Sequence, residues 1–181
     1  MKMILLIGMC FSMLVFAQTS RLTKPEVVKS VNLERYKGRW FEIAKIPNRF
    51  QKKCTSNTTA EYILREDGRI DVVNRCKREN GEIITAKGIA NIADTMSCAK
   101  LKVSFVSLLG IRPFWGDYWI IGLDKNYQWA IVGSPARNYG WILSRTPKLP
   151  QETRTKINRI LVKQGYDPDL FEATIHHSET N

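Results

Sequence analysis

Histidines, the side chains most often used for acid–base and metal chemistry, are scarce in this sequence of 181 residues. The only two, His176 and His177, stand side by side near the C-terminus. A Ser-His-Asp triad, or a metal or haem held by histidine, needs an imidazole that neighbouring elements position firmly within a site. The sequence therefore argues against hydrolytic triads and histidine-held groups, and it predicts no cofactor and no metal.

The first 17 residues have the pattern of a signal peptide. Lys2 precedes an uncharged apolar run, 3–16, which is too short to anchor the chain in a bilayer. Val15 and Ala17 occupy the two positions that a signal peptidase reads, so we predict cleavage after Ala17 and export. Cys10 is expected to leave with this peptide, because Met9 stands where lipid attachment needs a small residue. A buried N-terminal helix is the alternative interpretation.

Short strand patterns follow one another through the middle of the chain. Apolar residues alternate or cluster over short runs, and Asp67-Gly68 and Asn80-Gly81 mark tight turns. Because no helical pattern separates these runs, the sequence argues against a parallel sheet and favours an antiparallel barrel or sandwich. The predicted strands are 40–46, 58–64, 69–75, 83–92, 101–105, 118–123, 128–132 and 139–144.

One helix follows the strands. Ile157, Ile160 and Leu161 form a narrow apolar stripe in residues 149–163, and Gly165 ends the pattern. So narrow a stripe predicts a helix packed against the outside of the sheet, before a last short strand at 170–175. We interpret 18–32 as an arm and 33–177 as the folded domain.

The remaining cysteines predict one disulfide. Export would place Cys54, Cys76 and Cys98 in an oxidising compartment, where disulfides persist. Cys54 lies just before strand 58–64 and Cys76 at the end of strand 69–75. A tight turn joins these two strands, so both cysteines lie near the same end of the sheet. We predict a Cys54–Cys76 bridge with Cys98 free. Three free thiols in a reducing compartment are the alternative.

Three motifs stand in order along the strands. They are Gly38-Arg39-Trp40, Asp124-Lys125-Asn126-Tyr127, and the run Trp-Ile-Leu-Ser-Arg-Thr-Pro at 141–147. Together they resemble the three signature regions of the lipocalin family, and the fuller strings at 38–44, 99–105 and 141–147 are similar to its branch of bacterial Blc-type lipocalins and apolipoprotein D. The resemblance implies an all-β fold, an eight-stranded antiparallel up-and-down β-barrel with one C-terminal α-helix packed outside. It also implies that Trp40 closes one barrel end beneath Arg145.

Alternation along each strand sorts side chains into interior and exterior, once Trp40 is taken as interior. Many interior positions, Gly122 among them, carry Ala or Gly. This predicts an open cavity; a barrel filled by its own side chains is the alternative. Glu42 is either buried, and then partly neutral or paired with another group, or it lies at the cavity edge in contact with water. The predicted ligand-binding residues are Glu42, Ala44, Ala60, Tyr62, Leu64, Val72, Asn74, Ala86, Gly88, Val103, Phe105, Tyr118, Ile120, Val132, Trp141 and Leu143.

The composition is strongly basic, with 28 Lys and Arg against 17 Asp and Glu, a net charge of +11. A basic surface attracts anionic lipid headgroups or nucleic acid. No basic run interleaves with aromatic residues, so nucleic acid is not an expected partner. Association with membrane surfaces is an expectation, and a merely solvated basic surface is its alternative.

The resemblance implies a non-catalytic function. A lipocalin of this branch would bind, store or transport a small hydrophobic ligand, such as a fatty acid or lysophospholipid, for membrane maintenance. The second hypothesis is a lipocalin-type isomerase acting on a lipid through an interior cysteine, to which Cys76 is nearest by alternation. The expected location is the periplasm or the medium, and association with the outer membrane is a further alternative.

Overall fold

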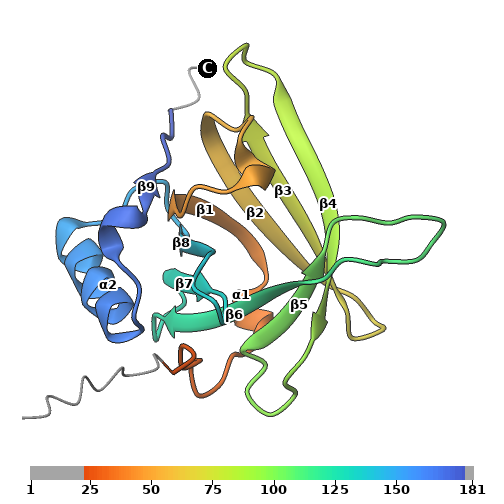
Figure 1. The fold of residues 1–181 in the computed structure, drawn as a ribbon, viewed down its shortest axis with the longest axis horizontal. Coiled ribbons are helices and arrows are strands. Elements are labelled where there is room, and N and C mark those ends of the chain that lie inside the picture. The colour runs from red at the N-terminus through yellow and green to blue at the C-terminus, as the bar shows by residue number, and fades with distance from the viewer. Residues whose placement is uncertain (1–22, 178–181) are drawn as a thin grey trace, which may run out of the picture.

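A single antiparallel sheet closes on itself to form the barrel (Figure 1). The computed structural model describes residues 23–177, so the predicted signal peptide, 1–17, lies outside the described residues. Strand β1 pairs with both β2 and β8, which closes the ring. The strands are β1 Gly38–Lys45, β2 Ser56–Leu64, β3 Ile70–Lys77, β4 Ile83–Ile92, β5 Lys100–Ser104, β6 Gly116–Leu123, β7 Trp129–Gly133, β8 Gly140–Ser144 and β9 Glu172–Ala173.

The predicted fold class is confirmed. Eight strands build the barrel, and the helix α2 (Gln151–Lys163) packs against its outside. The predicted ninth strand is reduced to the two residues of β9. They pair with Ala44 and Lys45 of β1, beyond the part of β1 that pairs with β2. The short helices are α1 Leu33–Tyr36, η1 Arg49–Gln51 and η2 Pro168–Leu170.

Because successive strands are antiparallel, the connections fall into two sets at opposite ends of the barrel. Helix α1 precedes β1 and lies at the end that we call closed. The closed-end connections are 65–69, 93–99, 124–128 and 145–150. The open-end connections are 46–55, 78–82, 105–115 and 134–139.

The N-terminal arm is hydrogen-bonded both to the barrel and to the residue that follows α2. The backbone N–H of Val28 donates to the carbonyl of Ile120 (2.9 Å), and that of Val31 donates to Ser97 (2.8 Å). Gln164, just after α2, holds Glu26 through two hydrogen bonds, from its side-chain amide to the Glu26 carbonyl (2.9 Å) and from the Glu26 N–H to its Oε1 (2.8 Å). The arm therefore links the barrel to the end of the outer helix.

Two apolar clusters lie on opposite faces of the barrel wall. The interior cluster contains Trp40, Tyr62, Leu101, Ile120 and Val132 among its buried members. The outer cluster lies beneath α2 and includes Ile121, Trp129, Ile131, Ile142, Ile157 and Leu161. Strands β1, β6, β7 and β8 contribute to both clusters, so this part of the wall separates the space inside the barrel from the helix outside it.

Two bulges change which face a strand residue presents. The register of β1 against β8 shifts between Glu42 and Ala44, and that of β6 against β7 shifts between Ile120 and Gly122. Beyond each extra residue the alternation reverses. The interior prediction for Ala44 is wrong, because Ala44 lies opposite Ile142 in the outer cluster. Gly122 likewise faces outward, pairing with Ile131.

The predicted disulfide is confirmed. Cys54 and Cys76 are bonded, with their Cα atoms 5.5 Å apart, and Cys98 is a free thiol among the described residues. The bond joins connection 46–55 to the end of β3. It therefore restrains the open end of the barrel.

Replacing both Cys54 and Cys76 with serine should lower the free energy of unfolding by about 3 kcal/mol, because the bond closes a loop of 22 residues in the unfolded chain. Urea unfolding of the oxidised protein and the double variant measures the difference. The matched control is Cys98→Ser, which removes a free thiol and should cost less than about 1 kcal/mol. Equal stability of the double variant and the parent would contradict a structural role for the bond.

Candidate ligand-binding site

The closed end is sealed by an indole under a guanidinium. The guanidinium carbon of Arg145 lies 3.8 Å from the centroid of the Trp40 ring, and Trp40 is fully buried. Arg145 Nη1 donates to the carbonyl of Arg39 (2.7 Å), and Nη2 donates to the carbonyls of residues 35–37 at 2.9, 3.1 and 3.0 Å. Trp40 Nε1 donates to the Tyr36 carbonyl at 2.8 Å. This geometry closes the barrel, as the family resemblance implied.

Three phenol hydroxyl groups form a chain within the interior cluster. The hydroxyl of Tyr118 lies 2.8 Å from that of Tyr36 and 2.8 Å from that of Tyr62. Burial raises the pKa of all three phenols, so each keeps its proton. Two hydrogen bonds use two of the three hydroxyl hydrogens. One hydrogen is left to meet a polar atom inside the barrel.

The interior wall changes from buried to accessible across four neighbouring strands. Trp40, Ala60, Asn74 and Ala86 lie opposite one another in register on β1, β2, β3 and β4. Trp40 is buried, Ala60 and Asn74 are half-buried, and Ala86 is exposed. Since paired residues share a face, this row runs from the sealed floor toward the mouth. The barrel is filled near its floor and accessible near its mouth.

A polar group lies near the mouth. Glu42 is buried, and its carboxylate accepts hydrogen bonds from Gln51 Nε2 (2.6 Å) and Thr174 Oγ1 (2.7 Å). Lys45 Nζ lies 3.7 Å from the same carboxylate. Trp141 Nε1 donates to Gln51 Oε1 at 3.0 Å. Of the two interpretations of Glu42, the buried and paired one holds.

An aromatic side chain fills the place that one small residue leaves free. A Cβ atom on Gly88 would come within 2.7 Å of Cδ1 of Phe105. The sequence interpretation took Gly88 as a sign of open space, and at this position it is wrong, because the Phe105 ring occupies that space. Phe105 itself lies just beyond β5 and is 42% exposed.

The structure brings most of the predicted site residues together. Ten of them belong to the interior cluster or pack against it: Ala60, Tyr62, Leu64, Val72, Val103, Tyr118, Ile120, Val132, Trp141 and Leu143. Asn74, Ala86 and Gly88 lie on the same wall by register, and the Phe105 ring lies against Gly88 just beyond the end of β5. Glu42 lies near the mouth, and Ala44 faces outward. Contact of any of them with a ligand remains a prediction.

Two residues of the site escaped the sequence analysis. Tyr36 lies before the first strand, and Gln51 lies in a connection, so strand alternation could place neither. The sequence signal that could have indicated the position of Gln51 is Asn48, three residues before it. The Asn48 side chain caps η1 by accepting from the N–H groups of Phe50 and Gln51. A short cap of this kind indicates an ordered connection rather than a flexible one.

Residues 23–177 contain no helix long and apolar enough to cross a membrane. The same part of the chain holds no group of three or more His, Cys, Asp or Glu side chains able to bind a metal ion.

Sequence comparisons match nearly the whole described chain. The family model of the lipocalin-like domain matches residues 31–176. Temperature-induced lipocalin-1 of Arabidopsis thaliana is 47% identical over 152 residues, covering 82% of this chain and 81% of the relative. Outer membrane lipoprotein Blc of Escherichia coli K12 is 36% identical, covering 80% and 79%. Mouse apolipoprotein D is also 36% identical, covering 83% and 79%.

The barrel also resembles solved structures. Insecticyanin of the tobacco hornworm Manduca sexta aligns with a TM-score of 0.69 and 24% identity, over 87% of this chain and 85% of that one. At this identity the likeness bears on the fold alone. It agrees with a closed barrel that carries its helix outside.

Proposed function

The chain belongs to the lipocalin family, whose members bind small hydrophobic ligands, and on that premise we propose that it carries one elongated lipid in its barrel without transforming it. A fatty acid or a lysophospholipid is the ligand class that we propose. The observation that supports this most directly is the row from Trp40 to Ala86, which is buried at the floor and accessible at the mouth. An apolar wall with this gradient fits a chain that enters from one side.

The apolar wall can supply the binding energy. Each methylene group that moves from water to an apolar wall contributes about 0.8 kcal/mol before the costs of ordering are subtracted. A chain of ordinary acyl length therefore needs no covalent bond for micromolar affinity. Val72, Val103, Val132 and Leu143 supply aliphatic wall on four different strands.

Polar groups stand at both ends of this wall. The tyrosine hydroxyls at the floor leave one hydrogen to donate, and Glu42, Gln51 and Trp141 form a hydrogen-bonded group near the mouth. A ligand with one polar end and a long apolar body can satisfy one of these groups while its chain covers the wall. This supports a lipid with a small headgroup over a pure hydrocarbon.

The cysteines support a non-catalytic role. Cys76, nearest to the interior by alternation, is held in a disulfide and has no thiolate to offer. Cys98 lies in a closed-end connection, where its Sγ contacts the carbonyl of Thr95 at 3.6 Å. The isomerase hypothesis therefore has no specific observation behind it.

We propose an exported protein that serves membrane maintenance. A disulfide is typical of an oxidising compartment outside the cytosol. The name of the Blc relative is that of an outer membrane lipoprotein, which supports the same placement. Export to the periplasm or the medium is part of the proposal.

Native mass spectrometry of the purified protein tests the carrier function. We expect one lipid to travel with each chain, and we expect delipidated protein to bind a fluorescent fatty acid at one site per chain with micromolar or tighter affinity. An unlabelled fatty acid should displace the probe. Protein that holds no lipid and gives no saturable signal with the fluorescent fatty acid would contradict the proposal.

A further inference from the structure

Exposed large apolar side chains are concentrated at the open end of the barrel. Of the 14 large hydrophobic side chains exposed among the described residues, eight lie in the open-end connections, and the closed-end connections carry only Met96. Seven of the eight belong to connection 105–115, which extends away from the barrel in Figure 1. Leu109 at its tip is 97% exposed. A patch of this size on a water-exposed segment marks an interaction surface.

Connection 105–115 is an ordered hairpin. The backbone groups of Leu108 and Ile111 exchange two hydrogen bonds of 2.8 and 2.9 Å across the turn at Leu109 and Gly110. Both turn residues have positive φ, 49° and 81°, as a tight hairpin turn requires. Arg112 Nη1 donates to the carbonyl of Ser104 (3.0 Å), which fastens the base of the hairpin to β5. Phe105 at the base lies against Gly88 of the wall, whereas Leu108, Leu109, Ile111 and Phe114 extend into water.

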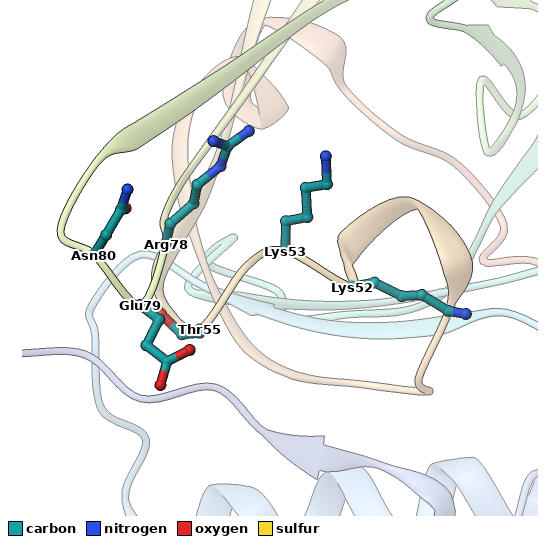
Figure 2. A pocket seen from close by; sticks show the side chains of 6 residues that line it. All are labelled: Lys52, Lys53, Thr55, Arg78, Glu79 and Asn80. Carbon is teal, nitrogen blue, oxygen red and sulfur yellow. The ribbon is translucent and has the colours of Figure 1, made fainter.

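Positive charge gathers at the same end. The open-end connections contain six basic and two acidic residues, a net charge of +4, whereas the closed-end connections contain five basic and four acidic ones. A hollow of about 490 Å³ at the open end is lined by Lys52, Lys53, Thr55, Arg78, Glu79 and Asn80. Figure 2 shows Lys53 and Arg78 extending in the same direction, with Lys52 pointing away from them.

The lysines of this hollow are free to meet an outside anion. Arg78 is paired with Glu82 at 2.8 Å, but none of the ion pairs found among residues 23–177 involves Lys52 or Lys53. The +11 net charge of the chain adds a long-range attraction of the same sign.

We propose that the open end docks onto an anionic lipid bilayer. The side chains of hairpin 105–115 enter the boundary between headgroups and acyl chains, while Lys52 and Lys53 approach lipid phosphates. An anionic bilayer fits because it offers an apolar layer to the hairpin and phosphates to the lysines at the same end of the molecule. A second copy of the chain fits less well, because two basic ends would repel each other. The inference goes beyond the proposed function, since docking needs no bound ligand.

Flotation of delipidated protein with vesicles tests the docking. On vesicles of equal parts phosphatidylcholine and phosphatidylglycerol, the double variant Leu108→Asp, Leu109→Asp should bind at least about tenfold more weakly than the parent. The double variant Lys52→Ala, Lys53→Ala should lose about tenfold at low salt, and the parent should lose a similar factor on pure phosphatidylcholine. Met96→Asp, an equally exposed position at the closed end, is the matched control and should bind as the parent does.

Failure of docking can be told apart from failure of the carrier function. Fluorescent fatty acid titration without vesicles should give the same affinity for the parent and for the Leu108→Asp, Leu109→Asp variant, since the hairpin tip lies outside the barrel. Parent protein that does not float with anionic vesicles, or a hairpin variant that floats as well as the parent, overturns the docking alone. Dimers in the parent that the hairpin variant abolishes, without vesicle binding, would assign the hairpin to a second copy instead.

Discussion

Replacing Arg145 with alanine should lower the free energy of unfolding by about 3 kcal/mol, the largest effect that we expect from a single side chain outside the two apolar clusters. The change removes the cation–π contact with Trp40 at 3.8 Å. It also removes four charge-assisted hydrogen bonds to the carbonyls of residues 35–37 and 39. Water can replace some of these bonds, because this side chain is only partly buried, and we keep the estimate modest for that reason.

Chemical denaturation of the parent and the variants measures this loss. Arg145→Lys keeps the charge but loses the flat, multiply donating head, so it should recover less than half of the difference. Arg159→Ala, on the exposed surface of α2, is the matched control and should stay within about 0.5 kcal/mol of the parent. A melting curve unchanged by Arg145→Ala would count against a structural role for this pair.

Substituting tryptophan for Ala60 should reduce fatty acid affinity at least about a hundredfold. Ala60 lies on the interior wall, opposite Trp40 on one side and Asn74 on the other. An indole there would occupy the space just above the sealed floor, where an acyl chain must lie if the barrel carries it. Titration with the fluorescent fatty acid, on protein shown to be folded by its melting curve, gives the result.

The control for this substitution lies on the same strand. Ile63 is 46% exposed and faces outward on β2, so Ile63→Trp adds the same ring on the other side of the wall. We expect this variant to keep the parent affinity. If folded Ala60→Trp protein keeps it as well, the ligand binds elsewhere on the molecule.

Most of the fold could be predicted from the sequence because its strands are short, regular and bounded by turn residues. The Asp67-Gly68 and Asn80-Gly81 turns both join paired strands, and the narrow stripe of α2 packs on the barrel exterior through Ile157 and Leu161. Alternation also places Tyr62 and Val72 inside correctly, since the register of β2 and β3 is unbroken along that stretch.

Alternation of side chains along a strand does not show where a bulge interrupts it. An extra residue at Ile43 in β1 and another at Ile121 in β6 switch the later side chains of each strand to the opposite face of the sheet. No residue type in those segments indicates a bulge. For that reason Ala44 and Gly122 face outward. The partners of Glu42 were also out of reach, because Gln51 and Thr174 come from segments whose position depends on tertiary packing.

The hairpin 105–115 was present in the sequence as an apolar stretch between two strands. Its density of large apolar residues resembles that of a buried strand, so the pattern alone does not say that these side chains face water. Only the observed backbone, with its turn at Leu109 and Gly110 and its base fastened by Arg112, separates an exposed hairpin from another wall strand.

The single-layered wall between the two clusters has a consequence for how this protein can change. Residues on the inner surface can be substituted while Ile142, Ile157 and Leu161 keep the contact between the wall and α2. The side chains that line the interior and the side chains that hold α2 are thus separate sets of residues. The interior could therefore be redesigned for a chosen ligand without repacking the outer helix.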